Sequence, residues 1–550
     1  MDPSKLRYVP LGGLGEVGLN MWALEWEGQV LVVDAGLMFP TEEMLGVDLV
    51  IPDVSWLLEE GRRVLGIFLT HGHEDHIGAL AFVLKRLNVP VYGTRMTLGL
   101  ARHRLREHRI LRESDLREVS AGDRVQLGPF RVEAIAVCHS IPDCVALAIQ
   151  TPVGRVVYTS DFKLDPDPLY GPPTDMKRFR KLGDEGVLLL LGDSTNAERP
   201  GVSGKERDLV PVFEEIFRNA PGRIVVCSFA SNIHRIQQVV SLAAQHGRRL
   251  AVVGRSIQNA FQTARELGFL EVPAGLVARI EDVADDPRAV LVCAGSQGEP
   301  LSALSRFAAQ RHNLVNVKAG DWVLLSARPI PGNERLVNRT INNLYRHGAR
   351  VFSAETDHVH VSGHAHREEL RELLGAVRPR YFIPVHGEYR QLVMHGDLAR
   401  EEGIAGARVL VVEDGRTVEL TKDSMTAGEE ISAGFVFVDG VGIGDVERAV
   451  LRDRRHLAND GILVVTVAID RENGSVLSGP ELISRGFIEK ETSEELMRDA
   501  RQQVLDTVRK FQGGRPDVEI LRDAVRDAAS RFLHKKTRRR PMVIPVVTEI

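Results

Sequence analysis

The run His71-Gly-His73-Glu-Asp75-His76 restricts the fold of this 550-residue chain more than any other feature. It lies between an apolar stretch, 64–70, and the segment HIGALAFVLKRL, whose apolar residues recur at helical spacing. In an extended turn the alternating His71 and His73 point the same way, whereas Asp75 and His76 point to a second place. Imidazole and carboxylate are natural zinc ligands when no cysteine is offered. The run therefore predicts a loop between a strand and a helix that serves two metal ions, rather than a set of solvated histidines.

Six residues cannot supply every ligand of two metals, so further ligands are expected at strand ends downstream. His139 closes RVEAIAVCH, Asp161 closes VVYTSD and His386 closes YFIPVH, each after an apolar run. Taken alone, each fits a structural histidine or a helix-capping aspartate. Together with the histidine run they predict one shared site.

The pattern of expected strands and helices changes several times along the chain, and these changes predict its domains. Short strands fill residues 1–204, strands alternate with amphipathic helices in 205–350, and short strands return in 351–425. The middle segment has the rhythm of a doubly wound parallel domain, whose strand ends usually bind ligands. A linker with a hairpin is expected over 426–451, followed by a small α/β domain over 452–550 with helices from Ser493 and Val518.

The composition of the chain indicates its cellular compartment and limits the argument for a nucleic-acid partner. The four cysteines form no CxxC pair and no disulfide framework, the N-terminus lacks a signal peptide, and no run of 18 apolar residues occurs. We therefore expect a cytoplasmic protein without a membrane partner. The net charge of -5 gives no global reason to expect a nucleic acid, so such a partner must be argued from local sites.

Gly13, Gly15 and Gly18 form a GxGxxG pattern with Asp34 downstream, which is the spacing of a dinucleotide-binding motif. That motif needs a helix after its third glycine, but 21–26 alternates like a strand. We therefore reject the dinucleotide interpretation.

Several motifs resemble known families. The segments HGHEDHIGAL, TSDFK and VVDAG, with His139, resemble the metallo-β-lactamase superfamily, and DSTNAERPG, SGHAH and PVHGEY resemble the extra motifs of its β-CASP nucleases. The opening GGLGEVGLN, the stretch HVHVSGHAHREEL and the C-terminal segment are most similar to the bacterial ribonuclease J family. The resemblance implies an α/β fold: a metallo-β-lactamase αββα sandwich with an inserted doubly wound β-CASP domain and a small C-terminal α/β domain.

The resemblance also implies a metal site with two Zn²⁺ ions per chain, with Mn²⁺ or Mg²⁺ as alternatives. His71, His73 and His139 would hold one ion, and Asp75, His76 and His386 the other, with Asp161 between them. Asp34 would orient a ligand without touching the metal. The implied catalytic residues are Asp75, His364 as the acid that protonates the leaving oxygen, and Asp193 beside His364. Asp193 could instead cap the Ser-Thr-Asn turn that follows it.

Two segments are candidates for binding the 5′ phosphate of a substrate, because each stands at a helix start where backbone N–H groups receive anions. Each also fits ordinary helix capping. The candidate residues are Ser228, Phe229, Ser231, Asn232, Arg235, Ser362, Gly363, His364, Ala365 and His366. The basic run 534–540 is interpreted as solvated.

The function implied is a zinc-dependent ribonuclease that degrades RNA from the 5′ end, also cuts internally, and acts in RNA maturation and decay. The alternatives are a DNA nuclease of the same superfamily and, less favoured, a small-molecule metallohydrolase, which would not need the inserted domain. The expected partners are single-stranded RNA and further copies of the chain as a homodimer or higher oligomer, with other RNA-decay proteins as candidates.

Overall fold

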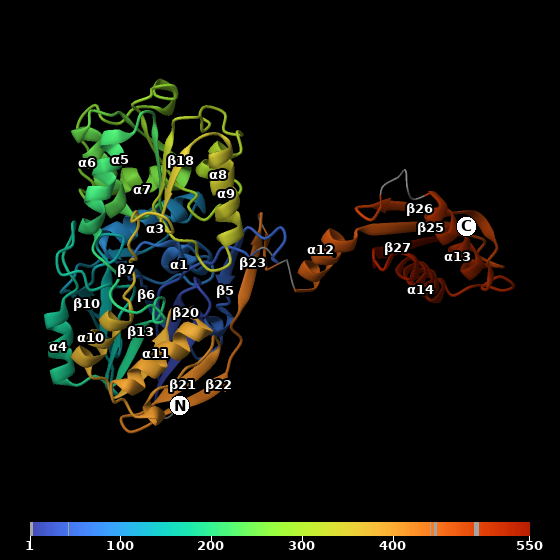
Figure 1. The fold of residues 1–550 in the computed structure, drawn as a ribbon. Coiled ribbons are helices and arrows are strands. Elements are labelled where there is room, and N and C mark those ends of the chain that lie inside the picture. The colour runs from blue at the N-terminus through green and yellow to red at the C-terminus, as the bar shows by residue number, and fades with distance from the viewer. Residues whose placement is uncertain (1–3, 42, 441, 445–447, 489–493) are drawn as a thin grey trace. The chain divides into compact units, whose positions relative to one another are not determined.

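The computed structural model describes residues 4–41, 43–440, 442–444, 448–488 and 494–550, and the chain divides into two compact units (Figure 1). Unit 1 comprises Met1–Phe39 and Leu49–Val436. Unit 2 comprises Pro40–Asp48 and Phe437–Ile550.

Two sheets face each other in unit 1. The first has eight strands in the order β22-β21-β1-β3-β4-β6-β7-β8. Its strands are β1 (Leu6–Gly12), β3 (Met21–Trp26), β4 (Gln29–Val33), β6 (Arg63–Phe68), β7 (Val91–Gly93), β8 (Leu116–Glu118), β21 (Arg416–Leu420) and β22 (Met425–Glu430). Alternating buried residues such as Leu31, Val33 and Phe68 line its inner face.

The second sheet has six strands in the order β19-β13-β12-β11-β10-β9. They are β9 (Arg124–Leu127), β10 (Phe130–Ala136), β11 (Val145–Gln150), β12 (Arg155–Tyr158), β13 (Leu189–Asp193) and β19 (Tyr381–Val385). Val132, Leu147 and Ile383 pack against the first sheet. Because β10, β12, β13 and β19 run in the same direction, their carboxyl ends lie at one edge.

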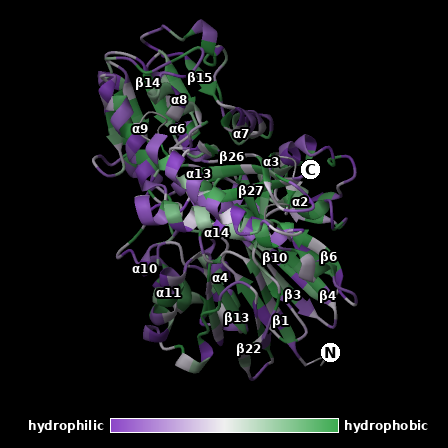
Figure 2. Cartoon of the chain, turned by 90° about the vertical axis from the view of Figure 1, so that its right-hand side faces the viewer, coloured by the Kyte–Doolittle hydropathy of each residue, from purple (hydrophilic) through white to green (hydrophobic). Residues whose placement is uncertain are grey.

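Helices cover the outer faces. On the second sheet lie α4 (Met176–Glu185), α10 (Arg367–Val377) and α11 (Tyr389–Glu401), held by one apolar cluster. Next to the first sheet lie α1 (Glu74–Ile77), α2 (Leu80–Leu84) and α3 (Arg95–Glu107), which contacts β7 and β8. The expected αββα sandwich is confirmed, and in Figure 2 strands such as β10 and β13 are mainly hydrophobic.

Shorter elements complete this sandwich. They are β5 (Leu49–Pro52), the parallel pair β2 (Leu14–Gly15) and β20 (Gly387–Glu388), and the 3₁₀ helices η1 (Ser55–Leu58) and η4 (Gly406–Arg408). The β2–β20 pair joins the glycine-rich loop near the N-terminus to the residues directly after His386.

The inserted segment forms a five-stranded parallel sheet in the order β15-β16-β14-β17-β18. Its strands are β14 (Ile224–Cys227), β15 (Leu250–Val253), β16 (Val290–Cys293), β17 (Trp322–Leu325) and β18 (Arg350–Ser353). One face packs on α5 (Val210–Asn219), α6 (Ile233–Gln245) and α7 (Arg255–Glu266), and the other on α8 (Ala303–Ala308) and α9 (Glu334–Arg346). The 3₁₀ helices η2 (Glu206–Leu209) and η3 (Ile280–Asp282) complete it. Helices on both faces confirm the doubly wound insert.

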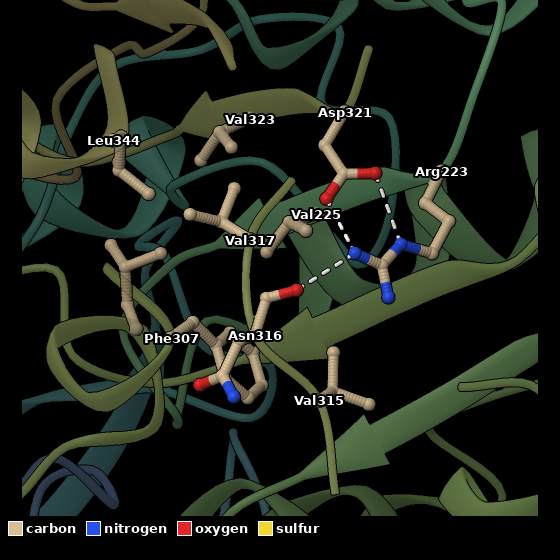
Figure 3. A pocket seen from close by; sticks show the side chains of 10 residues that line it. Arg223, Val225, Phe307, Val315, Asn316, Val317, Asp321, Val323 and Leu344 are labelled. Carbon is tan, nitrogen blue, oxygen red and sulfur yellow. Dashed lines mark hydrogen bonds and ion pairs between the residues drawn. The ribbon is translucent and has the colours of Figure 1, made fainter. Parts of the chain in front are cut away.

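A small cavity inside the insert is structural (Figure 3). Arg223 and Asp321, which precede β14 and β17, form a buried ion pair there with Nη2 and Oδ2 2.6 Å apart. The candidate residue Ser228 follows β14 at the opposite end of the strand. The cavity is therefore not at the ligand-binding edge of the sheet.

Unit 2 contains an α/β layer built on three strands in the order β26-β25-β27. They are β25 (Ile462–Ile469), β26 (Val476–Arg485) and β27 (Met542–Glu549), and one face packs on α13 (Glu494–Arg509) and α14 (Val518–Thr537). Unit 2 also holds α12 (Arg448–Asp460), β24 (Gly442–Ile443) and all but the first two residues of β23 (Phe435–Asp439), which pairs with β24.

Some boundary expectations differ from these elements. The segment 426–451, expected to be a linker with a hairpin, carries most of β22, then β23, β24 and the start of α12. Residues 441 and 445–447 of that segment, and Ser493, lie outside the described residues. The domain limits themselves stay predictions.

Two exclusions made from the sequence can be compared with the structure. Met21–Trp26 is a strand, so the helix required after a dinucleotide-binding GxGxxG motif is not formed there. None of the helices in the described ranges combines the length and apolar character needed to cross a membrane.

Candidate metal centre

The predicted ligands meet where the carboxyl edges of the two sheets of unit 1 come together. From the first sheet, Asp34 follows β4, and the loop after β6 carries His71 and His73 into α1. From the second sheet, His139, Asp161 and His386 follow β10, β12 and β19, and Asp193 ends β13. Strand direction explains the convergence, because every one of these residues stands at the carboxyl end of its strand.

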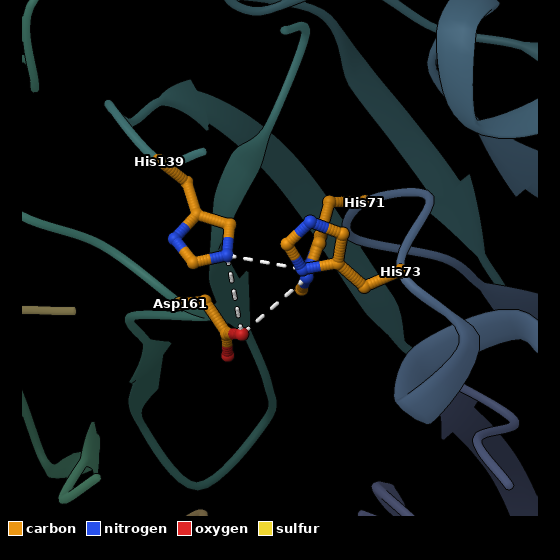
Figure 4. Close-up of side chains that lie close together, drawn as sticks. All are labelled: His71, His73, His139 and Asp161. Atoms are coloured by element: carbon orange, nitrogen blue, oxygen red, sulfur yellow. Dashed lines mark hydrogen bonds and ion pairs between the residues drawn. The ribbon is translucent and has the colours of Figure 1, made fainter. Parts of the chain in front are cut away.

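The cluster has two halves that share Asp161. In the first half, ligand atoms of His71, His73, His139 and Asp161 all lie within 4.8 Å of one another (Figure 4). In the second half, the same holds for Asp75, His76, Asp161 and His386.

The two oxygens of Asp161 face different halves. Oδ2 lies 3.4 Å from His71 Nε2 and 3.6 Å from His139 Nε2. Oδ1 lies 3.3 Å from His76 Nε2. The structure thus brings together all seven residues expected to be ligands.

Three atoms at the centre of this cluster are buried without a hydrogen-bond partner: His71 Nε2 and both carboxylate oxygens of Asp161. A buried polar atom with no partner costs about 1–3 kcal/mol, and more when it is charged. The geometry is therefore that of a cation site, since a cation would satisfy all three atoms.

Electrostatics give two of the histidines and Asp161 the protonation states of metal ligands. Burial lowers the pKa of His73 to about 3 and that of His139 well below its usual value, so both imidazoles are neutral. Burial opposes ionisation of Asp161, but His386 and His76 lower its pKa well below the usual range. Asp161, Asp193 and Asp75 raise the pKa of His386 to about 10 against the effect of burial, so His386 must lose a proton to bind a metal.

Neighbouring groups fix how the ligands are oriented. Asp34 Oδ2 lies 2.8 Å from His76 Nδ1, while Asp34 Oδ1 accepts from the N–H of Thr70 at 2.8 Å. His139 Nδ1 lies 2.7 Å from the carbonyl oxygen of Gly363. Each imidazole thereby keeps its Nε2 towards the cluster.

The backbone is strained at the same point. Asp34, Ser160 and His386 adopt positive φ values of 60°, 53° and 56° although none is glycine. Such conformations cost about 1–3 kcal/mol each and persist where the surrounding structure requires them. Here they turn Asp34, Asp161 and His386 off their strands into the cluster.

His364 stands at the open side of the cluster. Its Nδ1 lies 2.8 Å from Asp193 Oδ2, and its Nε2 lies 3.9 Å from Asp161 Oδ2. Burial works against the charged imidazole, but Asp193 and Asp161 together raise the pKa of His364. Asp193 Oδ1 also accepts from the N–H of Thr195 at 3.0 Å, so this carboxylate both contacts His364 and caps the turn.

The candidate phosphate-binding segments lie at two helix starts. Asn232 caps α6 by accepting from the N–H of Arg235 at 3.1 Å. In the second segment, the Ser362 hydroxyl accepts from Asn196 Nδ2 at 2.8 Å and from the N–H of His364 at 3.1 Å. Both ring nitrogens of His366 are buried without a partner.

Arg235 does not present its guanidinium to solvent. The side chain is fully buried, with Nη2 2.8 Å from Glu206 Oε2 and Nη1 3.1 Å from the carbonyl oxygen of Val359. Nη1 also contacts the Ser326 hydroxyl. These contacts connect α6 to the chain three residues before Ser362.

Sequence reasoning missed several residues that support the cluster. Asn20 Nδ2 donates to Asp75 Oδ2 at 3.3 Å and lies 3.1 Å from His76 Nε2. Thr195 Oγ1 lies 2.7 Å from His386 Nδ1, and Ser140 Oγ lies 3.2 Å from His73 Nε2. The first belongs to GGLGEVGLN and the second to DSTNAERPG, but amide and hydroxyl side chains in loops carry no signal for such contacts.

Comparison with known families assigns the class. Residues 14–199 match the metallo-β-lactamase superfamily model, and residues 352–411 match the Zn-dependent metallo-hydrolase RNA specificity domain. This is a metallo-β-lactamase fold of the metal-dependent hydrolase class. A protein of unknown function from Enterococcus faecalis V583 shares the fold, with a TM-score of 0.54, 17% identity and coverage of 76% of this chain and 100% of its own.

The particular family follows from the rest of the chain. Residues 221–344 match the ribonuclease J β-CASP domain, and residues 449–550 match the ribonuclease J C-terminal domain. Ribonuclease J2 of Bacillus subtilis is 41% identical over 100% of this chain and 99% of its own length. Ribonuclease J 1 of Streptococcus pyogenes is 38% identical, covering 100% of this chain and 98% of its own. The chain belongs to the ribonuclease J family.

Proposed function

We propose that this chain is a metal-dependent ribonuclease that hydrolyses RNA phosphodiesters with two zinc ions. The observation that carries the proposal is the two-sided cluster around Asp161, whose buried oxygens have no hydrogen-bond partner. The chain's membership of the ribonuclease J family supports the choice of RNA.

The ligand assignment is part of the proposal. His71, His73 and His139 hold one ion, Asp75, His76 and His386 hold the other, and Asp161 serves both. The all-nitrogen-and-oxygen donor set suits zinc, with Mn²⁺ or Mg²⁺ as alternatives. When bound, such a pair supplies activated water and neutralises the charge on the scissile phosphate.

The protein's own groups position the reaction and move one proton. Asp34 holds the Nδ1 proton of His76, so that Nε2 stays free to act as a ligand. Asp193 Oδ2 accepts from the Nδ1–H of His364, and Asp193 and Asp161 together raise the pKa of His364, so the charged ring carries a second proton on Nε2, which faces the cluster. That proton goes to the 3′ oxygen as it leaves, because a histidine that is protonated at the operating pH can act as the general acid.

The direct test compares cleavage of end-labelled RNA with that of DNA of the same sequence, with and without chelator and zinc. We expect cleavage of RNA only, its loss with chelator, and its return with zinc. Equal cleavage of DNA would favour the alternative DNA nuclease.

The two-metal assignment has its own test. Asp75→Ala and His76→Ala should each abolish cleavage and lower the zinc content, while RNA binding changes less, because the metals act on the scissile phosphate alone. A variant that keeps a large part of the wild-type rate at saturating zinc or manganese would disprove the assignment.

We further propose that the enzyme degrades RNA from a 5′ monophosphate end and also cuts internally, in RNA maturation and decay. The pocket comprises Ser228, Ser231 and the loop 362–366, where hydroxyls stand beside helix starts. Half-buried Phe229 would stack a terminal base, worth about 1–3 kcal/mol. Arg235 is assigned to holding α6 in place rather than to phosphate binding, because its guanidinium is buried.

A comparison of 5′ monophosphate, triphosphate and hydroxyl RNA tests this pocket in wild type and Ser362→Ala. We expect a monophosphate preference that weakens in the variant. Equal rates on all three ends in the wild type would contradict the proposed pocket. An unchanged preference in the variant would show that the 5′ end is bound at another place.

The proposal also covers the binding partners of the chain and its cellular compartment. Single-stranded RNA is the substrate, and unit 2 is proposed to join copies of the chain into a homodimer or higher oligomer, with other RNA-decay proteins as further partners. All four cysteines carry free, buried thiols, which supports a reducing cytoplasm as the setting.

A further inference from the structure

One stretch of unit 1 carries much more positive than negative charge. Between Lys85 and Arg112 there are eight lysines and arginines but a single acidic residue, Glu107. The chain as a whole has a net charge of -5, so this excess runs against the overall balance. The stretch begins directly after α2 and comprises β7, the whole of α3 and the turn that follows α3.

The geometry of α3 gathers these charges on its exposed side. Arg95, Arg102 and Arg106 are spaced by seven and four residues, which places them on one face of a helix with about 3.6 residues per turn. Lys85 Nζ lies 3.1 Å from His108 Nδ1, so the end of α2, with Arg86, meets the end of α3. Arg109 and Arg112 continue the exposed side beyond the helix.

Five of these arginines have no acidic partner among the described residues: Arg86, Arg102, Arg106, Arg109 and Arg112. We call these five the α3 arginine surface. All five are exposed. Several exposed arginines elsewhere in unit 1 are paired, as in Arg180–Glu372 at 3.1 Å and Arg380–Asp423 at 2.9 Å.

This surface borders the metal loop. A Cβ atom added to Gly72 would lie 2.6 Å from Leu100 Cδ1, so α3 packs directly behind the histidine run. Arg104 Nη2 holds Glu74 Oε1 of the same loop at 2.8 Å. On its other side α3 meets the insert, where His103 Nε2 lies 2.8 Å from Thr263 Oγ1.

The chemistry of the surface fits a polyanion better than a protein. Within the described residues, none of the large exposed hydrophobic side chains falls between 85 and 118. Protein interfaces depend on buried apolar and aromatic anchors, which are lacking here. Arginines without anchors suit a phosphate backbone, which is bound mainly by charge and without regard to sequence.

We propose that the α3 arginine surface binds the phosphate backbone of the RNA lying outside the metal site, and so holds the body of the substrate while one end is cut. This inference rests on the proposed ribonuclease function. It predicts that long RNA is bound more tightly, and with a steeper salt dependence, than short RNA.

The test is the triple variant Arg102→Gln/Arg106→Gln/Arg109→Gln. The slope of log affinity against log salt for long RNA should fall by about 2, since each lost contact to a single strand removes about 0.7. Affinity for long RNA at low salt should drop about tenfold or more by the same relation, and KM should rise with it. Cleavage of a short oligoribonucleotide should be unchanged.

Two controls separate charge from folding. Arg180→Gln/Arg371→Gln/Arg380→Gln removes the same charge from ion-paired positions and should leave the slope unchanged. Replacing Arg102, Arg106 and Arg109 by lysine should keep most of the slope, because the charges remain.

If the glutamine triple variant binds long RNA with the same affinity and the same salt dependence as the wild type, the proposal is overturned. An acidic protein would then be the better candidate partner for this surface. The binding measurement is independent of cleavage. A wild type that binds long RNA through these arginines but cuts no RNA would therefore refute the proposed function and leave this inference standing.

Discussion

Asp161 shows how much of the chemistry depends on single residues. It stands after β12, beyond a strained Ser160, and offers one oxygen to each half of the cluster. His364 depends on its neighbours in the same way, since Asp193 both raises its pKa and determines which nitrogen faces the cluster. At this scale, function follows from orientation rather than from residue type alone.

The role of His364 as a proton donor can be separated from a role in binding. On RNA, His364→Ala should lower kcat by about 10²–10⁴, the usual contribution of general acid catalysis. On a nitrophenyl phosphodiester, whose leaving group needs no proton, the loss should be small. An equal loss on both substrates would show that His364 does not act as the acid.

A pair of carboxyl groups near His386 predicts a pH effect on stability. Burial raises the pKa of Glu16 to about 7, and burial together with Glu16 raises that of Asp414 well above its usual value. Because these groups hold protons more tightly in the folded chain, their contribution is complete below about pH 4.3 and is lost as the pH rises through about 7. Glu16→Gln should therefore reduce the fall in Tm between pH 6 and pH 8.

The exposed Glu215 serves as the control for this effect. Glu215→Gln should leave the dependence of Tm on pH as in the wild type. A fall in Tm that is the same in wild type and Glu16→Gln would contradict the prediction.

The sequence predicted these residues unevenly. His139, Asp161 and His386 could be identified because each ends an apolar strand, and strand ends meet at one edge. Asn20, Thr195 and the carbonyl of Gly363 could not, because contacts made by loop amides, hydroxyls and backbone depend on the folded path of the chain.

At the scale of elements, α6 connects the insert to the metal domain through buried charge. Burial opposes ionisation of Glu206, but Arg235 and Lys163 lower its pKa to about 2. Lys163, two residues after Asp161, approaches Glu206 Oε1 to 3.8 Å. The first turns of α6 are thus joined through Glu206 to the loop that carries Asp161.

Removing the centre of this network should be costly. Glu206→Ala leaves Arg235 and Lys163 buried without their carboxylate, which typically destabilises a protein by about 3–5 kcal/mol. The matched control is Glu214→Ala on α5, which breaks an exposed pair with Arg218 and should cost about 0.2–1 kcal/mol. Urea unfolding of both variants tests this, and similar midpoints would mean that the network is not needed for stability.

Element types were predictable where periodicity was strong, as in β3, β10, β11 and the alternating strands and helices of the insert. The path of residues 40–48 was not, because this segment belongs to unit 2 through contacts distant in sequence. Arg454 Nη1, for example, donates to the carbonyl of Leu45 at 2.9 Å. A hairpin was expected within 426–451 and β23 pairs with β24 there, but the pairing of β22 with β21 was not expected, since pairing partners leave no local pattern.

At the scale of the whole molecule, unit 2 offers a surface for association. One face of its sheet packs on α13 and α14, and the other carries Ile483, Val464 and Ile544, which are paired across the three strands. Ile483 and Ile544 are 49% and 41% exposed, and Val546 nearby is 43% exposed. Contiguous exposed apolar residues commonly mark association sites.

Changing this face should alter assembly without altering the metal site. Ile544→Glu is expected to shift the sedimentation coefficient towards the monomer, because the new charge would be buried in the interface. Zinc content and cleavage of short RNA should remain as in the wild type. Sedimentation identical to wild type would remove this face as the site of self-association.

The distribution of the metal ligands along the chain also bears on how the enzyme is made. Asp75 and His386 face each other across 311 residues, and the entire insert lies between them in sequence. Pairing such distant segments is slow, because the chain loses the entropy of closing a long loop before any stabilising contact between the segments forms. A ribosome must release His386 before the second half of the centre can assemble, so a partly synthesised chain holds an incomplete metal site. On the proposed ligand assignment, nuclease activity is therefore delayed until His386 has emerged and unit 1 has closed around it.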